Sequence, residues 1–231
     1  QMGIIGAVEG LAPGERIYSA RFQGDKGFMV TFRQVDPLFT LDLSDPTNPQ
    51  AVGELKIPGY SAFLQTRGTE RLVGVGMDGT DSGQITGVSV SLFDVSDFAD
   101  PTQVDRVSVD TDWGTSEALW DHHAITMHGN LLTVPFQGYN YDSDSYESGL
   151  LVVDITKNDI SERTRLTHQS LVEAFYCDGD PDCEEREVYA YDAQIRRSIV
   201  MDDYLFTISR FGIMISDLAN GEDSVKSVLF Q

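Results

Sequence analysis

Positive charge is scarce in this sequence. Its 231 residues include 16 lysines and arginines against 37 aspartates and glutamates, for a formal net charge of −21. Nucleic acids and anionic membranes are bound through cationic side chains, which displace counterions from phosphate groups. We therefore expect no nucleic-acid partner and no insertion into a membrane. The charge favours cations and basic partners instead.

Long apolar runs and catalytic signature motifs are also missing. No run approaches the ~20 apolar residues that a membrane-spanning helix needs, and no signal peptide is visible. The sequence has no nucleophile elbow, P-loop or dinucleotide fingerprint, because Gly74-Val75-Gly76 is too short and no helical pattern follows it. Both ends, Gln1-Met2-Gly3 and Val228-Leu229-Phe230-Gln231, resemble cleavage scars, so we expect an excised piece of a longer protein.

Cysteine is limited to Cys177 and Cys183, which flank a short segment containing Gly and Pro. This spacing favours a disulfide that closes a small loop over two free thiols, and a disulfide would indicate an oxidising compartment. A structural zinc site is excluded for the pair alone, since no second pair completes four ligands.

An aspartate recurs at the end of an apolar run in four places. The copies are Leu41-Asp42-Leu43-Ser44, Phe93-Asp94-Val95-Ser96, Val153-Asp154-Ile155-Thr156 and Ser216-Asp217-Leu218-Ala219. The aspartates lie 52, 60 and 63 residues apart, a period in the range of propeller blades with insertions. Their carboxylates can accept hydrogen bonds from the following turn, so we expect them to be structural turn anchors.

Each repeat contains four short apolar runs rich in Val, Ile, Phe, Tyr and Thr, separated by Gly, Asp, Asn and Pro. The runs lie at 17–22, 28–32, 38–43 and 51–57; 60–64, 72–75, 87–95 and 103–109; 118–127, 131–136, 150–155 and 163–168; and 195–201, 204–208, 213–218 and 225–230. This pattern predicts an all-β β-propeller of four-stranded antiparallel blades. The expected blades are 10–59, 60–110, 111–169 and 170–231.

Residues 1–9, and Ile4 to Val8 within them, are predicted to be a residual strand of a preceding blade. The four blades would close as a four-bladed ring or form part of a larger ring. A larger ring would need missing sequence or a second copy of the chain, because open propeller edges are prone to pairing.

Long acidic loops are expected on one face of the propeller, where loops on a rigid scaffold commonly carry function. Asp142, Asp144 and Glu147 form the best candidate for a calcium site, since closely spaced carboxylates can surround this ion with oxygens. The alternative is a solvated acidic loop. Weaker candidates of the same kind are Asp78 with Asp81, and Asp178 with Asp180 and Asp182.

Glu117, Asp121 and His123 are the best candidates for catalysis or for binding a transition metal. They fall in or beside the expected first strand of the third repeat, where alternation places Asp121 and His123 on one face and His122 on the other. The alternative is a polar, hydrogen-bonded channel, since Arg21, Gln65 and Arg197 occupy similar positions in other first strands. Of the two tryptophans, Trp120 is expected to pack in a blade, whereas Trp113 either packs or stacks on a sugar.

Several strings resemble bacterial and archaeal secreted proteins with a C-terminal β-propeller domain. They include Gly10-Leu11-Ala12-Pro13-Gly14-Glu15-Arg16-Ile17-Tyr18, Leu55-Lys56-Ile57-Pro58-Gly59, Ser91-Leu92-Phe93-Asp94-Val95-Ser96-Asp97 and Ser116-Glu117-Ala118-Leu119-Trp120-Asp121-His122. The resemblance runs across nearly the whole chain. It implies a secreted or surface-attached propeller and transfers no catalytic residues, because the family has no settled activity.

Two functions follow from these observations. The first is a secreted, non-catalytic scaffold that binds a protein or glycan through its acidic loop face, with calcium stabilising a loop and self-association closing the ring. The alternative is a metal-assisted hydrolase or glycan-active enzyme at the mouth of the central channel, using Glu117, Asp121 and His123. A channel mouth plugged by Arg–Asp pairs and apolar side chains would exclude the enzyme.

Overall fold

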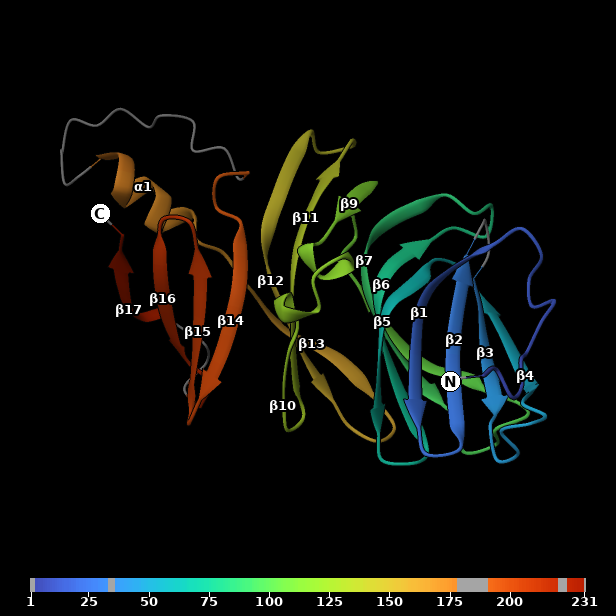
Figure 1. The fold of residues 1–231 in the computed structure, drawn as a ribbon. Coiled ribbons are helices and arrows are strands. Elements are labelled where there is room, and N and C mark those ends of the chain that lie inside the picture. Colours follow the sequence, from blue (N-terminus) through green and yellow to red (C-terminus); the bar gives the residue numbers. More distant parts are fainter. Residues whose placement is uncertain (1–2, 33–35, 178–190, 220–223, 231) are drawn as a thin grey trace. The chain divides into compact units, whose positions relative to one another are not determined.

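The computed structural model describes residues 3–32, 36–177, 191–219 and 224–230 (Figure 1). Most of these residues lie in four antiparallel sheets, and within each sheet consecutive strands are hydrogen-bonded neighbours, except that β9 pairs with β11. The prediction of an all-β chain built from four-stranded antiparallel blades is confirmed. No helix in the described part of the chain is both long and apolar enough to cross a membrane.

The chain divides into two compact units, and the first comprises Gln1–Ser108 with Lys157–Ile160. Its first sheet contains β1 (Arg16–Gln23), β2 (Lys26–Phe32), β3 (Asp36–Asp42) and β4 (Gln50–Ile57). Its second sheet contains β5 (Tyr60–Arg67), β6 (Arg71–Gly79), β7 (Ile85–Asp94) and β8 (Thr102–Ser108). Each of these strands overlaps one of the predicted apolar runs.

The second unit comprises Val109–Thr156 and Ser161–Gln231. One sheet contains β10 (Thr126–His128), β11 (Leu131–Asn140), β12 (Ser145–Ile155) and β13 (Ile160–Leu166), with β9 (Trp113–Thr115) paired to β11. The other sheet contains β14 (Ile195–Met201), β15 (Tyr204–Ser209), β16 (Gly212–Asp217) and β17 (Ser224–Leu229). The helix α1 (Gln169–Cys177) lies between these sheets in the sequence.

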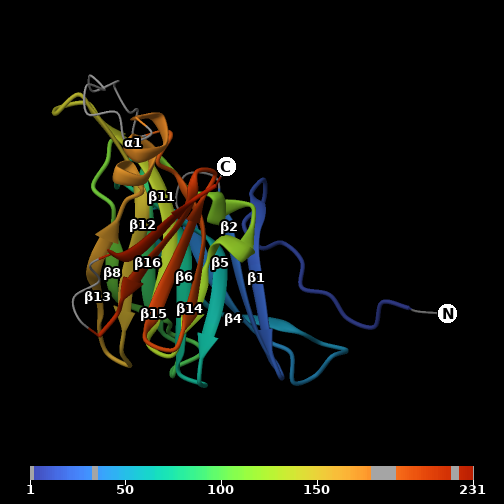
Figure 2. The ribbon, with the colours of Figure 1, turned by 90° about the vertical axis from the view of Figure 1, so that its left-hand side faces the viewer.

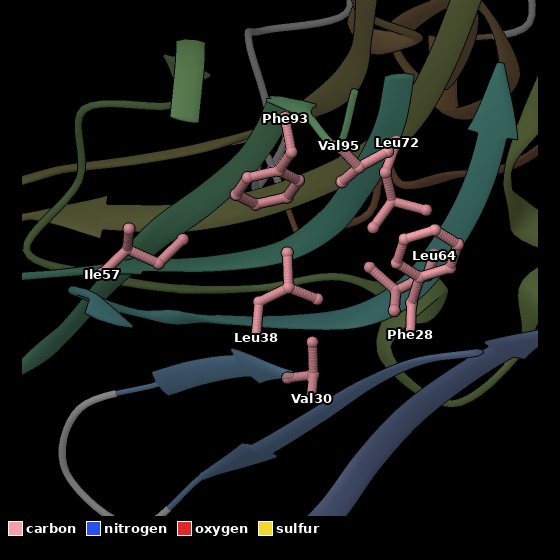
Figure 3. Close-up of a cluster of buried hydrophobic side chains, with 8 residues drawn as sticks. All are labelled: Phe28, Val30, Leu38, Ile57, Leu64, Leu72, Phe93 and Val95. Carbon is pink, nitrogen blue, oxygen red and sulfur yellow. The ribbon is translucent and has the colours of Figure 1, made fainter. Parts of the chain in front are cut away.

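The core of the first unit lies between its two sheets. Phe28, Leu38, Leu72 and Phe93 are each at most 1% exposed, and Figure 3 shows them directed toward one another from β2, β3, β6 and β7. Burying one side chain of this size contributes about 1.5–3 kcal/mol. The alternating apolar residues of the repeats therefore supply the force that packs one sheet on the other.

The second unit has a core of the same kind and a smaller one under α1. Leu131, Leu150, Val152, Ile195 and Leu205 form the first cluster, which joins its two sheets. The second contains Leu171, Val172, Ala193 and Phe211. The strand pattern did not predict α1, because the helix is short and its buried face rests on a contact with the distant Phe211 rather than on a long periodic stripe.

Three of the four repeated aspartates accept a backbone hydrogen bond from the turn after their strand. The N–H groups of Ser44, Ser96 and Ala219 donate to Asp42, Asp94 and Asp217 at 2.9, 2.8 and 2.8 Å, respectively. Asp154 accepts both Nε and Nη2 of Arg163, at 2.7 and 2.6 Å. Asp42, Asp94 and Asp217 thus act as the turn anchors that the repeat predicted, whereas Asp154 pairs with Arg163.

The prediction of a leftover strand at Ile4 to Val8 is wrong. These residues form no strand (Figure 2), and Ile4 is 92% exposed. A strand needs a neighbour for its backbone hydrogen bonds, and no described strand pairs with this segment. The segment instead runs close to the turn after β3, where a Cβ on Gly6 would lie 2.7 Å from Pro49 Cδ.

Candidate functional site

The segment expected to be one strand from 118 to 127 is folded as two turns and a short strand. Glu117–Leu119 and His122–Ala124 are 3₁₀ turns, and only Thr126–His128 is extended as β10. The side chains of Ser116 and Asp121 accept the N–H groups of Ala118 and His123. Such caps satisfy donors at the start of a helical turn, which explains why the strand prediction is wrong here.

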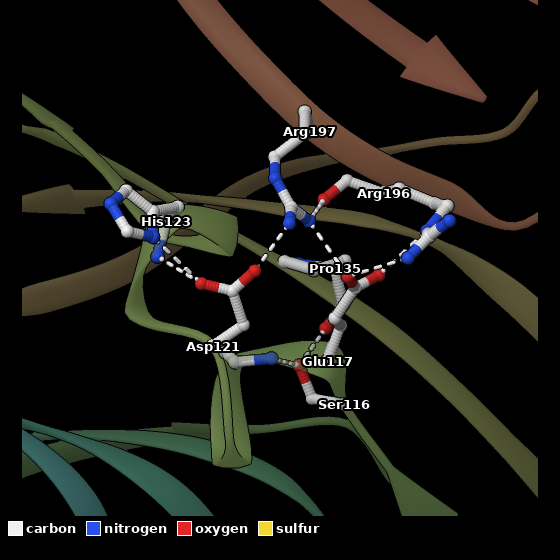
Figure 4. A network of polar contacts seen from close by, with 8 residues as sticks. Ser116, Glu117, Asp121, His123, Pro135, Arg196 and Arg197 are labelled. Atoms are coloured by element: carbon white, nitrogen blue, oxygen red, sulfur yellow. Dashed lines mark hydrogen bonds and ion pairs between the residues drawn. The ribbon is translucent and has the colours of Figure 1, made fainter.

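Glu117 is held by two arginines at the start of β14 (Figure 4). Arg196 donates from Nε and Nη2 to its two carboxylate oxygens, both at 2.9 Å. Arg197 Nη1 donates to Oε1, also at 2.9 Å. These hydrogen bonds, that from Arg196 foremost, lower the pKa of Glu117, so the carboxylate is ionised at neutral pH.

Asp121 is also fully engaged. Its Oδ1 accepts the His123 backbone N–H at 3.0 Å and lies 2.9 Å from His123 Nδ1. Its Oδ2 accepts a hydrogen bond from Arg197. The backbone hydrogen bond from His123 is the largest of the contributions that lower the pKa of Asp121. Asp121 and His123 therefore meet, as predicted, but through a capped turn rather than through strand alternation.

His122 does not point away from this cluster, contrary to the strand prediction. Its ring centroid lies 4.1 Å from that of His123, and both side chains are exposed. Among the described residues, Asp121, His122 and His123 place one potential metal-ligating atom each within 4.8 Å of one another. Glu117 is not in this set, and its carboxylate is bound to Arg196 and Arg197 instead.

The arrangement limits what these residues can do in catalysis. A general acid needs a pKa near the working pH, whereas the pKa of both carboxyls is lowered. Each carboxylate is also neutralised by a guanidinium, so Glu117 and Asp121 are suited to joining the turns at 117–124 to β14. Trp120, expected to pack in the blade, is 68% exposed, so that prediction is wrong.

The predicted calcium residues lie on a hairpin rather than in an open loop. Asn140 pairs with Ser145, so a four-residue turn joins β11 to β12, and Asp144 takes a left-handed φ of 51° in it. Tyr139 donates its hydroxyl hydrogen to Asp144, and Glu147 lies 3.6 Å from Arg165. The structure thus gives two of the three carboxylates protein partners, and calcium binding by Asp142, Asp144 and Glu147 stays a prediction.

The weaker acidic candidates have different outcomes. Asp78 lies near the C-terminal end of β6, where Arg106 and Ser108 donate hydrogen bonds to its carboxylate. It therefore serves the second sheet of the first unit. Asp178, Asp180, Asp182 and Cys183 lie outside the described residues, so the disulfide between Cys177 and Cys183 stays a prediction.

Pairing of β9 with β11 creates a feature that the sequence did not predict. Tyr139 is the register partner of both Trp113 on β9 and Tyr146 on β12. Directly opposed residues project from the same face of a sheet. Trp113, Tyr139 and Tyr146 therefore form a row across three strands, here called the aromatic row. The alternation of Tyr139 and Tyr141 was the signal that could have indicated an aromatic face.

The aromatic row is exposed at Trp113 and half-buried at Tyr139 and Tyr146, and the exposed Tyr141 and Asp112 lie beside it. Trp113 is 48% exposed, and Tyr141, whose ring centroid lies 5.4 Å from that of Tyr139, is 66% exposed. Asp112 Oδ2 accepts the Tyr141 N–H at 2.8 Å, while the Asp112 N–H donates to the Tyr139 carbonyl at 3.0 Å. These hydrogen bonds fix the backbone at Tyr139 and Tyr141 next to Asp112.

A pocket of about 230 Å³ adjoins the row at Tyr146. Its lining residues come from β11, β12, β13 and the start of α1: Phe136, Tyr146, Glu147, Ser148, Arg165, Leu166, Thr167 and Gln169. Tyr146 donates its hydroxyl hydrogen to Gln137 Oε1 at 2.6 Å. Burial, with the neighbouring Tyr191, raises the pKa of Tyr146 to about 12, so this phenol stays protonated.

Comparison with known proteins places the chain in a family. Residues 1–221 match the family described as "Beta propeller domain". An uncharacterized protein of Archaeoglobus fulgidus is 41% identical over 160 residues, which cover 68% of this chain and 24% of that protein. An uncharacterized protein of Methanocaldococcus jannaschii is 43% identical over 140 residues, 61% of this chain and 21% of that protein.

The chain therefore spans less than a quarter of the length of these two relatives. The match to the family covers nearly all of the residues that build the four sheets. It agrees with the antiparallel four-stranded sheets seen in the structure and with the blade pattern of the repeats. The chain belongs to the β-propeller domain family.

Proposed function

We propose that this domain is a non-catalytic β-propeller that binds a protein or glycan ligand outside the cell through the aromatic row and the carboxylates beside it. The observation that carries the proposal is the exposure of Trp113 on a backbone fixed by the β9–β11 pairing, with the exposed Tyr141 beside it on a backbone held by Asp112. Aromatic side chains supply large contact areas and stack on planar or apolar ligand faces. A rigid platform loses little conformational entropy when a ligand binds.

The polar cluster around Glu117 supports a scaffold rather than an enzyme. Both carboxylates of the catalytic candidates are bound by arginines, Glu117 by two and Asp121 by Arg197. A hydrolase would need at least one of them to exchange protons near neutral pH. Their contacts instead tie the 3₁₀ turns to β14, as expected of a structural cluster.

The extracellular setting and the self-association are parts of the same proposal. A disulfide between Cys177 and Cys183 would suit an oxidising compartment, and the excess of 37 acids over 16 bases disfavours nucleic acid as a ligand. The molecular mass of the protein in solution tests how the propeller ring closes. A monomer is expected for a four-bladed ring, and a dimer for a ring shared by two chains.

Binding can be followed at the aromatic row itself, because the chain has two tryptophans. In the variant Trp120→Phe, Trp113 is the single tryptophan and reports directly on the row. We expect its fluorescence to change saturably with a soluble hexasaccharide of β-1,4-linked glucose or N-acetylglucosamine, or with decalysine. The matched variant Trp113→Phe retains Trp120 and should show no change. Absence of a saturable change with all three probes would refute the proposal.

A further inference from the structure

Two adjacent exposed histidines, His122 and His123, lie on the second 3₁₀ turn directly after its capping residue Asp121. We propose that their imidazole nitrogens bind a divalent transition-metal ion such as Zn²⁺ or Cu²⁺, with Asp121 orienting the ring of His123. The three side chains place one potential ligating atom each within 4.8 Å of one another. The inference goes beyond the proposed function and does not rest on it, because the aromatic row takes no part.

The contact between His123 and Asp121 decides which ring nitrogen can bind a metal. Asp121 Oδ1 lies 2.9 Å from His123 Nδ1, and an ionised carboxylate only accepts hydrogen bonds. Nδ1 therefore carries the proton, and Nε2 of the neutral ring keeps its lone pair. Figure 4 shows the other ring nitrogen of His123 turned away from Asp121. Metal-binding histidines commonly have this arrangement, in which a carboxylate fixes the ring through the nitrogen that does not bind the ion.

His122 supplies the second nitrogen. Its ring centroid lies 4.1 Å from that of His123, and the two ring planes are inclined by 33°. Two nitrogens bound to one tetrahedral zinc ion at about 2.0–2.1 Å lie about 3.4 Å apart. Both side chains are exposed, so rotation about their χ angles can bring the nitrogens to this spacing. The backbone stays in place, since the N–H of Ala124 donates to the Asp121 carbonyl at 3.0 Å.

The charges beside the histidines do not oppose a cation. Arg197 donates to Asp121 Oδ2 and to Glu117, and Arg196 also donates to Glu117. The two guanidinium charges are therefore balanced by two carboxylates. In Figure 4, Arg197 and His123 lie on opposite sides of the Asp121 carboxylate, so this carboxylate separates an ion on His123 from the guanidinium. The net charge of −21 favours cations in general.

The donor atoms determine the class of ion. Imidazole nitrogens suit zinc, nickel and copper, whereas calcium and magnesium prefer oxygen ligands. Cu²⁺ binds a given set of donors more tightly than Ni²⁺ or Zn²⁺ does. Two protein nitrogens leave the remaining positions of the ion to water, unlike a structural zinc site with four protein ligands. We therefore expect the ion to bind the folded chain without being required for folding.

Isothermal titration with ZnCl₂ and with CuCl₂, on protein without a histidine tag, tests the inference. We expect one ion to bind per chain, Cu²⁺ more tightly than Zn²⁺, and an excess of Ca²⁺ to displace neither. His122→Ala and His123→Ala should each abolish this saturable binding. His128→Ala, at another exposed histidine, should leave it unchanged, and circular dichroism without metal should show that each variant is folded.

The orienting role of Asp121 is tested by Asp121→Ser. Serine still caps the turn but has no carboxylate to accept the Nδ1 hydrogen of His123. We expect the metal affinity to fall about tenfold. In the metal-free protein, ¹⁵N NMR should show the Nδ1–H tautomer of His123 in the wild type and a shift toward the Nε2–H tautomer in the variant. An unchanged tautomer and affinity would show that Asp121 only caps the turn.

Three results would overturn the metal site. The first is the absence of saturable binding of both ions to the wild-type protein. The second is equal binding by the wild type, His122→Ala and His123→Ala, because acidic side chains would then hold the ion. The third is loss of binding in His128→Ala. None of these results bears on the proposed function, since Trp113→Phe should bind the metal as the wild type does.

Discussion

Arg196 donates two parallel hydrogen bonds to Glu117, from Nε and Nη2 to the two carboxylate oxygens, each at 2.9 Å across 79 positions of sequence. Glu117 is 17% exposed, and Arg197 binds it from a second direction. Bidentate arginine–carboxylate pairs fix the relative orientation of the two side chains better than single hydrogen bonds at the surface do. The pair therefore joins the turns at 117–124 to β14, a role that can be measured as stability.

The first prediction concerns this pair. Glu117→Gln removes the charge that both arginines bind, so we expect the free energy of unfolding at pH 7 to fall by about 1 kcal/mol, the upper range for partly exposed ion pairs. The pKa of Glu117 is lowered in the folded protein, so its stabilisation is present above the unfolded pKa of about 4.3 and is lost as pH falls further. Urea unfolding should thus show a smaller difference at pH 3 than at pH 7, with Glu173→Gln as the control.

A second prediction follows from the buried His168. Its Nε2 lies 2.7 Å from Thr207 Oγ1, its Nδ1 is buried without a protein partner among the described residues, and burial lowers its pKa to about 4. Between pH 6.5 and 4 the unfolded chain binds a proton that the folded one does not. Stability contributed by neutral His168 is therefore full above pH 6.5 and is lost as pH falls toward 4.

The measurement for His168 is the slope of unfolding free energy against pH in that window. One histidine accounts for up to about 1.4 kcal/mol per pH unit. We expect His168→Gln to reduce the slope, even if it lowers stability at every pH. His128→Gln, at an exposed site, should leave the slope unchanged. Equal slopes in wild type and His168→Gln would show that His168 does not titrate as described.

A third prediction addresses the repeated turn. Asp94 accepts the backbone N–H and the hydroxyl of Ser96 at 2.8 and 2.6 Å, and Arg71 Nη1 lies 2.8 Å from its other oxygen. Asp94→Ala should lower the free energy of unfolding by about 2 kcal/mol, and Asp94→Asn by less, since the amide oxygen still accepts from the turn. Asp100→Ala, on the exposed side of the next turn, is the matched control. Equal losses in all three variants would contradict an anchoring role.

The fourth prediction is calcium binding by Asp142, Asp144 and Glu147. At a calcium concentration ten times the Kd, binding would stabilise the folded state by about 1.4 kcal/mol. Calcium sites on extracellular modules are weak, with a Kd of about 10⁻⁴–10⁻³ M. Calcium should thus raise the melting temperature of the wild type and not that of Asp144→Asn. Identical melting curves in calcium and in chelator would rule the site out.

Much of the fold could be predicted because blades are built from short-range signals. Strand alternation and turn residues predicted the observed bounds of β14. Apart from 118–127, the other predicted runs begin and end within five residues of the observed strands. The failures occur where side chains compete with the strand. Ser116 and Asp121 cap turns within 118–127, and α1 depends on Phe211, whose ring lies 5.0 Å from that of Phe175.

The candidate site divides in the same way. Asp121 and His123 were predicted to meet, and they do so because they are two positions apart and the contact is local. The binding of Glu117 by Arg196 was not predictable, nor was the alignment of Trp113 with Tyr139. Each requires two segments to be brought together by a particular strand register, and a pattern within one segment carries no information on that register.

The all-β class, the four repeated blades and the turn-anchoring aspartates Asp42, Asp94 and Asp217 could be predicted from the sequence, because they depend on neighbours a few residues apart. The binding of Glu117 and Asp121 by arginines and the shared face of Trp113, Tyr139 and Tyr146 became evident from the folded structure alone. Those arrangements depend on pairing and packing between distant strands, which local preferences do not specify.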